Sequence, residues 1–349
     1  MKKLLALMLA LSMSVIFASC TPAQTGDNSS DSAYTESGDS AEENKYELNH
    51  LTGEYTLAKT AVDKRPIGIM INNIKASLPQ RGIAKADLYY EAVAEGGITR
   101  ILALFSDIDT IPDLGSVRSA RHYYLSLAMG HNAIYCHFGG SIYVLNYIKN
   151  NNINTVNFIS TAASYRDPDR VGKYAYEHTA FTDGERLKKA INRKKIETDA
   201  KINDAFKFGD NSAILSGGNA ATNITVPFSG STKATYTYDA ESGLYKKGQF
   251  GQDHIDASTG ETLAVKNVIV LQTTVGSLAN ADKDGRLEFD LSGGTGYYAC
   301  DGKIVHITWK KGGYNDPMKY YTLDGNELTV APGKTYVSIL SNTATVSYN

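Results

Sequence analysis

The feature that most constrains the fold is a change of pattern near residue 205. Before it, from about residue 60, short β-branched and apolar runs alternate with segments whose apolar residues recur at helical spacing, which favours an α/β layer structure. After it, short strand-like segments are separated by Gly, Asn and Asp turns, such as Asp301-Gly302. The pattern predicts an α/β N-terminal domain over residues 51–204 followed by a smaller mostly-β C-terminal domain over residues 205–349.

The individual elements follow from the same periodicities. In the first domain, strands are predicted over 66–72, 87–94, 98–106, 133–138 and 155–159, and helices over 118–129 (with Ser116 as N-cap), 142–149 and 183–193. In the second domain, strands are predicted over 223–226, 234–238, 264–273, 297–300, 303–310, 319–323, 327–330 and 336–340, and no helix is expected.

The N-terminus has the form of an export signal. Lys2 and Lys3 precede an apolar run over residues 4–18 that is too short for a comfortable membrane span, and small residues close it before Cys20. Phe17-Ala18-Ser19-Cys20 resembles the lipobox of bacterial lipoproteins. We therefore expect a signal peptide over residues 1–19 and a lipid on Cys20 that anchors the protein to the outer face of the cytoplasmic membrane. An ordinary secretory signal ending near a cysteine is the alternative.

The segment after Cys20 is predicted to be a tether. Residues 21–44 contain six acidic residues, five serines and no Lys or Arg, a composition that cannot bury a core. We assign residues 20–50 to the lipidated cysteine and a disordered, acidic, Ser-rich linker. A flexible coil of that length spans roughly 25–30 Å.

Charge and cysteine content exclude several classes of protein. The formal net charge of -2 argues against a general nucleic-acid binder. Cys136 and Cys300 are expected to be buried free thiols rather than a disulfide pair, since two cysteines make no disulfide framework. The seven histidines are scattered, so we predict no metal site and no cofactor.

Three arginines form the leading candidate for a ligand site. Arg118 and Arg121 are spaced to share one face in the first turn of the predicted helix, where the helix dipole disfavours cations, and Arg100 lies on a neighbouring predicted strand. A negative group is therefore expected beside them. It could be a ligand phosphate or carboxylate, or it could be Glu91 or Glu95 in a structural ion-pair network.

Two further segments could add to such a site. His137 with Gly139, Gly140 and Ser141 lies at a predicted strand-to-helix turn, where free backbone N–H groups can form an anion nest, although turn geometry alone also explains the glycines. Arg166 and His178 flank a polar loop, and His178 could act as a general base, as Glu91 or Glu95 could.

No recognised catalytic motif is present, neither a Gly-x-Ser-x-Gly elbow nor a Ser-x-x-Lys, His-Glu-x-x-His or phosphate-binding P-loop pattern. Whether the protein is an enzyme therefore stays open, and a binding module is favoured. Its partners would be the membrane, through the lipid, and an anionic envelope ligand or an envelope protein. The alternatives are an enzyme acting on an envelope polymer or lipid-phosphate precursor, and a structural lipoprotein with no small ligand.

Several blocks of the sequence resemble the YerB-like lipoproteins, a two-domain family of unknown function from Gram-positive bacteria. The resemblance covers about residues 60–340. It is most specific at Val117-Arg118-Ser119-Ala120-Arg121 and at Glu95-Gly96-Gly97 with Thr99-Arg100, and the second half shows Asp253-His254-Ile255-Asp256 and Trp309-Lys310-Lys311. Ser116 and Glu177-His178-Thr179 depart from the family pattern. The resemblance implies an envelope lipoprotein with two domains and supplies no reaction.

Overall fold

The computed structural model describes residues 45–199, 201, 203–279 and 285–349, so the predicted signal peptide, Cys20 and most of the tether lie outside the described residues. The described residues form one compact unit. The first described strand, β1 (Tyr46–Leu48), pairs with β2 (Tyr55–Ala58) in a small ribbon, so the last residues of the range assigned to the tether are ordered here.

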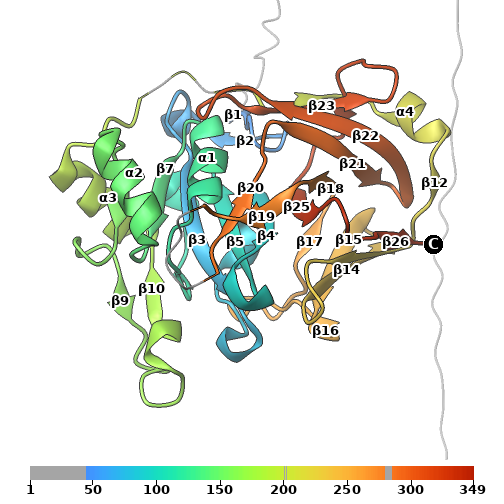
Figure 1. Cartoon of the computed structure of the whole chain (residues 1–349). Coiled ribbons are helices and arrows are strands. Elements are labelled where there is room, and N and C mark those ends of the chain that lie inside the picture. The colour runs from blue at the N-terminus through green and yellow to red at the C-terminus, as the bar shows by residue number, and fades with distance from the viewer. Residues whose placement is uncertain (1–44, 200, 202, 280–284) are drawn as a thin grey trace, which may run out of the picture. The chain divides into compact units, whose positions relative to one another are not determined.

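One large sheet of 11 strands dominates the molecule (Figure 1). Its first half contains β3 (Ile67–Asn73), β4 (Leu88–Val93), β5 (Thr99–Phe105), β7 (Ile134–His137) and β8 (Val156–Asn157). Its second half contains β12 (Asn219–Ala220), β18 (Asn267–Thr273), β21 (Gly293–Cys300), β22 (Lys303–Lys311), β23 (Met318–Thr322) and β25 (Thr335–Ser341). The strand order is β12-β22-β21-β18-β25-β4-β5-β3-β7-β8, and β23 pairs with β22. The two halves meet where β25 lies parallel to β4.

A second sheet of six strands belongs entirely to the C-terminal half. It contains β13 (Asn223–Pro227), β14 (Lys233–Asp239), β15 (Leu244–Gln249), β16 (Gln252–Asp253), β17 (Ala264–Val265) and β26 (Ser347–Tyr348). Its buried residues, such as Ile224 and Tyr236, join the same apolar cluster as Ile67 and Ile69 of the large sheet. The second sheet therefore packs against one face of the first.

The remaining strands are short. β6 (Leu114–Gly115), β9 (Tyr165–Arg166) and β10 (Ala180–Thr182) form a three-stranded sheet, while β11 (Lys207–Phe208) pairs with β24 (Thr329–Val330) and β19 (Val275–Ser277) pairs with β20 (Leu287–Phe289). β9 and β10 carry an arm, residues 167–179, that projects from the body at the lower left of Figure 1.

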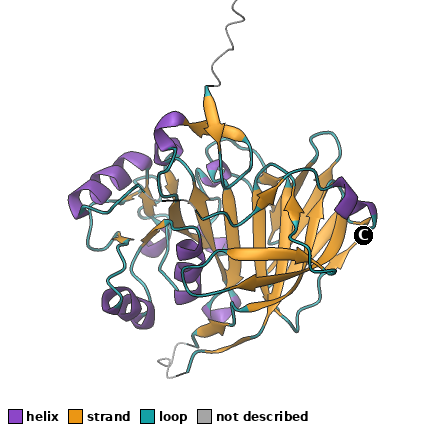
Figure 2. Cartoon of the chain, turned by 90° about the horizontal axis from the view of Figure 1, so that it is seen from above, coloured by secondary structure: helices purple, strands orange, loops and turns teal. Residues whose placement is uncertain are grey.

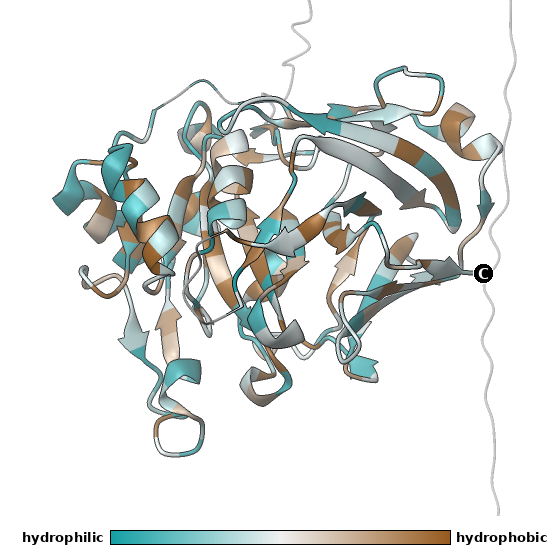
Figure 3. Cartoon of the chain, viewed as in Figure 1, coloured by the Kyte–Doolittle hydropathy of each residue, from teal (hydrophilic) through white to brown (hydrophobic). Residues whose placement is uncertain are grey.

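Helices are few and lie around the sheets (Figure 2). They are α1 (His122–Gly130), α2 (Ile142–Asn150), α3 (Gly184–Lys194) and the short α4 (Ser212–Ser216). The prediction of an α/β N-terminal domain is therefore confirmed only in part, because this half is mostly sheet. The predicted absence of helix after residue 205 is wrong at α4. In Figure 3 the polar helix α3 contrasts with the hydrophobic central strands.

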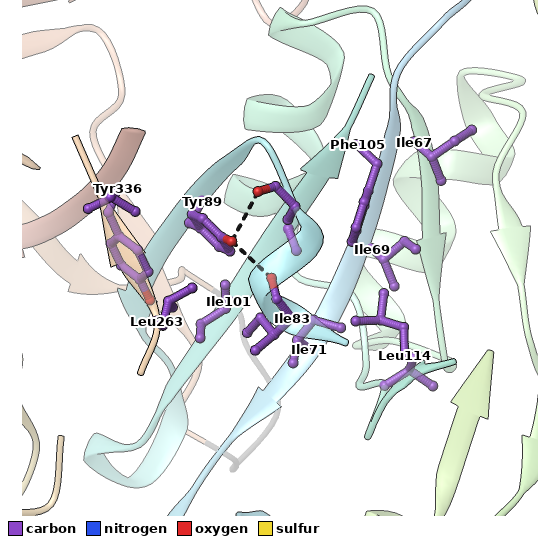
Figure 4. Packing of buried hydrophobic residues seen from close by; sticks show 14 of the residues in the cluster. Ile67, Ile69, Ile71, Ile83, Tyr89, Ile101, Phe105, Leu114, Leu263 and Tyr336 are labelled. Atoms are coloured by element: carbon purple, nitrogen blue, oxygen red, sulfur yellow. Dashed lines mark hydrogen bonds between the residues drawn. The ribbon is translucent and has the colours of Figure 1, made fainter. Parts of the chain in front are cut away.

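The core has two sides because the side chains of a strand alternate between faces. In β3, Ile67, Ile69 and Ile71 enter one apolar cluster and Met70 enters the other. Figure 4 shows the first cluster, in which the Tyr89 hydroxyl donates to the carbonyls of Ile83 and Ala86. Both sides of β3 are buried, which explains its almost continuous apolar sequence.

Cys136 and Cys300 are both free and buried, as predicted. Both lie on strands of the large sheet, Cys136 within β7 and Cys300 at the end of β21.

The predicted helix over residues 118–129 starts too early. Val117 bridges Ile71 of β3 in antiparallel fashion, and the Arg118 N–H donates to the Met70 carbonyl at 2.8 Å. Pairing with β3 thus holds residues 115–118 in an extended conformation, and α1 begins only at His122 with Arg121 as its extended N-cap. Arg118 and Arg121 therefore do not share a helix face.

Close packing in the large sheet makes one glycine replacement informative. A Cβ added at Gly296 of β21 would lie 2.3 Å from the Val270 carbonyl oxygen. We expect Gly296→Ala to lower the free energy of unfolding by about 1–3 kcal/mol through overpacking, measured by urea denaturation. Gly276→Ala on β19, where a Cβ would have no neighbour within 4 Å, is the matched control. Equal stability of the two variants would contradict the packing argument.

Candidate functional site

The candidate site lies beyond the carboxyl ends of β3 and β7, two parallel neighbours in the large sheet. β7 pairs with β3 at residues 67–69, and the extended segment 115–118 takes its place beside residues 70–72. Carboxyl ends of parallel strands are where open α/β sheets usually bind ligands. The candidate site therefore lies where β7 stops pairing with β3 and the extended segment that carries Val117 pairs with β3 instead.

Strand pairing places four polar residues on one face. Arg100 of β5 pairs with Asn72 of β3. The Asn72 N–H donates to the Ser116 carbonyl at 2.9 Å, next to the bridge between Ile71 and Val117. Paired residues on neighbouring strands point to the same face, so Arg100, Asn72 and Ser116 share a face. Residues two apart on one extended segment also share a face, so Arg118 lies on the same face as Ser116. We call Asn72, Glu95, Arg100, Ser116, Arg118 and Arg121 the arginine site.

Four buried polar atoms of this face have no hydrogen-bond partner among the residues that the structure describes. They are Asn72 Oδ1, Arg100 Nε, Ser116 Oγ and Arg118 Nε. Buried polar atoms are normally paired, and leaving one unpaired costs about 1–3 kcal/mol. Four unpartnered polar atoms therefore lie close together on one face of the large sheet.

The charge of the site is unbalanced. Glu95, in the 3-10 turn Glu95–Gly97, accepts from Arg121 through Nε at 2.5 Å and Nη2 at 2.6 Å. Nη2 of Arg100 lies 3.7 Å from the same carboxylate, and Nη1 of Arg286 lies 3.8 Å from it. Because Arg100 and Arg121 share a single carboxylate, the site keeps an excess of positive charge.

Burial of the arginines makes this excess of positive charge costly in free energy, because burial disfavours a charged group. It lowers the pKa of Arg100 to about 10, and the nearby charge of Arg121 acts in the same direction. Burial also lowers the pKa of Arg118, which Glu177 partly opposes. An anion bound here would reverse both effects, because an opposite charge favours the charged guanidinium.

The comparisons with known proteins agree on one family. Residues 51–197 match the N-terminal domain, and residues 224–337 the C-terminal domain, of a family described as "Protein of unknown function (DUF3048)". The "Putative lipoprotein YerB" of Bacillus subtilis (strain 168) is 30% identical over 298 residues, which is 83% of this chain and 85% of that protein.

The chain belongs to the DUF3048 family. A crystal structure of YerB from Bacillus subtilis superimposes with a TM-score of 0.75 at 27% identity, covering 86% of this chain and 99% of that one. The resemblance to YerB-like proteins and the presence of two domains are confirmed. In this DUF3048 protein the two domains share the large sheet.

The predicted anion nest is occupied by the protein itself. The Gly139 N–H donates to Asn157 Oδ1 at 3.0 Å, and Ser141 caps α2 by accepting from the Val144 N–H. His137 Nδ1 lies 2.6 Å from the Gly139 carbonyl oxygen, and burial lowers its pKa to about 4. Gly140 bridges Ala120. These residues hold the segment that carries Arg118, whose carbonyl accepts from the Phe138 N–H at 2.9 Å.

Arg166 and His178 lie at the base of the arm. Arg166 stacks on Tyr176 at 3.8 Å and on Phe138 at 4.8 Å from the ring centroids, and its Nη1 donates to the Tyr176 carbonyl at 2.6 Å. His178 Nδ1 is 2.8 Å from Asn72 Nδ2, and burial lowers its pKa. His178 therefore joins the arginine site through Asn72, whereas Arg166 braces the arm.

Glu91 is not a partner of the arginines. It lies on the opposite face of the sheet and contacts Lys247 of β15, with 3.4 Å between carboxylate and ammonium. Hydrogen bonds connect Glu91 to Asn73, Asn73 to Gln80, Gln80 to His254 and His254 to Lys247, and the ion pair between Lys247 and Glu91 closes the ring. All five residues are buried. We call this set the buried ring. It joins the two domains directly behind the arginine site.

The sequence analysis missed Asn72 and Ser116 in the arginine site and Lys247 and His254 in the buried ring. The local signals were the pair Asn72-Asn73 at the end of an apolar strand and the block Asp253-His254-Ile255-Asp256. Within the described part of the chain, no group of three or more His, Cys, Asp or Glu residues is placed to hold a metal ion. Nor does any helix of that part have the length and apolar character needed to cross a bilayer.

Proposed function

We propose that this DUF3048 protein is anchored by a lipid on Cys20 to the outer face of the cytoplasmic membrane and binds an anionic oxygen-bearing group at the arginine site. The anchoring is supported by Phe17-Ala18-Ser19-Cys20 and by the relative named as a lipoprotein. The ligand chemistry is that of a phosphate or carboxylate belonging to an envelope molecule.

One observation carries the binding proposal. The Nε atoms of Arg100 and Arg118 and the Ser116 hydroxyl are buried and lie on the same face of the sheet. None of them has a hydrogen-bond partner among the described residues. Guanidinium groups bind phosphate and carboxylate oxygens more strongly than neutral donors do. The unpartnered acceptor Asn72 Oδ1 suits a hydroxyl on the same ligand, as in a protonated phosphate or a sugar phosphate.

The enzymatic alternative has less support from the same geometry. Burial alone would raise the pKa of Glu95, but the hydrogen bonds and charge of Arg121 outweigh it and the pKa is lowered. A carboxylate held ionised in this way orients arginines better than it donates protons. Glu91 is enclosed in the buried ring.

Replacing Arg118 with alanine tests the proposal. Arg118 is half-buried, so the fold should persist, while loss of a charge-assisted contact worth about 1.5–3 kcal/mol should weaken anion binding roughly 10- to 100-fold. The measurement is the thermal shift and calorimetric titration of the mature chain with inorganic phosphate and pyrophosphate.

Two further variants sharpen this test. Arg193→Ala, at an exposed position in the last turn of α3, removes the same charge away from the site and should leave binding unchanged. Ser116→Ala removes a neutral donor and should weaken binding less than Arg118→Ala. Equal anion responses in the wild type, Arg118→Ala and Arg193→Ala would refute the arginine site.

A further inference from the structure

Exposed large apolar side chains gather around the segment that carries Arg118. Among the described residues, Ile142, Ile159 and Tyr176 are each at least 64% exposed, and Tyr143 is 43% exposed. Isolated exposed apolar residues are ordinary, but a contiguous group beside a charged site marks an interaction surface.

Hydrogen bonds bring together the segments that carry these side chains. Asn157 Oδ1 accepts from the backbone N–H groups of both Gly139 and Ile159, which ties the Ile159 loop to the turn after β7. Ile142 and Tyr143 begin α2 immediately after that turn.

The arm completes the surface. Arg166 stacks on Phe138 and on Tyr176, so Tyr176 is held against the same turn. We call Ile142, Tyr143, Ile159 and Tyr176 the apolar rim. The carbonyl of Arg118 accepts from the Phe138 N–H, so the turn beside the rim is bonded to the segment that carries Arg118.

We propose that the apolar rim and Arg118 together dock onto the surface of an anionic phospholipid bilayer, with a headgroup phosphate at the arginine site. This inference rests on the proposed function and names the source of the anion. The rim side chains would enter the boundary between headgroups and acyl chains, where tyrosine is favoured because it has an apolar ring and a polar tip.

A bilayer fits the observations better than another occupant. The rim is carried by three separate features, namely the start of α2, the Ile159 loop and the projecting arm (Figure 1). Basic groups beside exposed apolar side chains are the combination that binds anionic membrane surfaces. Residues 21–44, expected from their sequence to be a flexible coil spanning roughly 25–30 Å, would keep the body within reach of the surface.

A second group of exposed apolar residues is less suitable. Tyr46, Leu48 and Tyr55 lie on the β1–β2 ribbon, next to Glu47 and Glu54. Glu177, next to Tyr176, is exposed as well, so carboxylates do not separate the two groups. The rim is preferred because Phe138 connects it to the segment that carries Arg118.

Vesicle binding by the mature chain tests the inference. Cys20→Ser removes the expected acyl anchor, and flotation is measured with vesicles of phosphatidylcholine alone and with vesicles containing an equal amount of phosphatidylglycerol. We expect binding only to the anionic vesicles, weakened by salt. Ile159→Asp and Tyr176→Ser should each reduce it by about tenfold. Leu323→Asp, at a 69% exposed position in the C-terminal domain, is the matched control and should leave it unchanged.

Thermal shifts with inorganic phosphate, measured on the same variants, separate the two proposals. A phosphate response without vesicle binding would overturn the docking inference and leave the proposed function standing. Failure of both responses would overturn both. Vesicle binding lost in Tyr55→Ser but retained in Ile159→Asp and Tyr176→Ser would place the contact on the ribbon and reject the rim.

Discussion

Replacing Glu91 with glutamine is expected to lower the free energy of unfolding by about 3–5 kcal/mol, because it leaves the ammonium of Lys247 buried without a counter-charge. The side chains of Glu91 and Lys247 are 1% and 0% exposed. Burial lowers the pKa of Lys247, and the Glu91 carboxylate opposes that effect. The measurement is urea denaturation followed by circular dichroism at neutral pH.

A double-mutant cycle provides the control. Lys247→Met should be destabilising for the same reason, since it strands the carboxylate among Asn73, Thr99 and Tyr336. The double variant removes both charges and should cost clearly less than the two single changes together. Purely additive losses, or single losses below about 1 kcal/mol, would show that the pair is not a stabilising contact between the domains.

The difference between neighbouring lysines shows why the buried ring could not be predicted. Lys246 is on the surface, 2.8 Å from Asp239, and Lys247 is fully buried. Adjacent residues of a strand face opposite sides, but which side is buried depends on the partner sheet. For Lys247 the partner is the large sheet, where its ammonium lies over the ring of Tyr336 of β25, far away in the sequence.

Local elements were predictable where local signals were strong. The predicted strands over residues 66–72 and 98–106 match β3 and β5, and the helices predicted over 142–149 and 183–193 match α2 and α3. Ser141 and Asp183 cap those two helices with their side chains, a signal readable from sequence.

The arrangement of the elements was not predictable in the same way. The two domains are joined by the parallel pairing of β4 and β25, which leaves no trace in local periodicity. At Arg118, pairing with β3 outweighed a helical pattern of apolar residues. Of the predicted site residues, Arg100 and Arg121 come together at Glu95, and Arg118 lies on the same face of the sheet as Arg100, although Arg118 and Arg121 share no helix face. Strand register, rather than helical spacing, creates the site.

Mild acid is expected to destabilise the protein strongly. Burial lowers the pKa of His131 and of His137 to about 4 and lowers that of His254 well below its usual value near 6.5. A histidine with a lowered folded-state pKa is protonated first in the unfolded chain. Its contribution to stability is therefore complete above about pH 6.5 and is lost as the pH falls toward the folded-state pKa.

Between pH 7 and pH 5 His131 and His137 should each cost roughly 2 kcal/mol, and His254 should add a loss in the same direction, so that the total is a large share of the stability of an ordinary domain. Glu95 acts at lower pH because its pKa is lowered, and Asp87, whose pKa burial raises, acts in the opposite direction because the folded protein takes up its proton first. The measurement is the free energy of unfolding against pH. His137→Gln should reduce the slope near pH 5.5, while His306→Gln, at an exposed position, should leave it unchanged. A stability that stays flat from pH 7 to pH 5 would mean that these imidazoles can take up protons in the folded protein, and that the buried ring is open to water at His254.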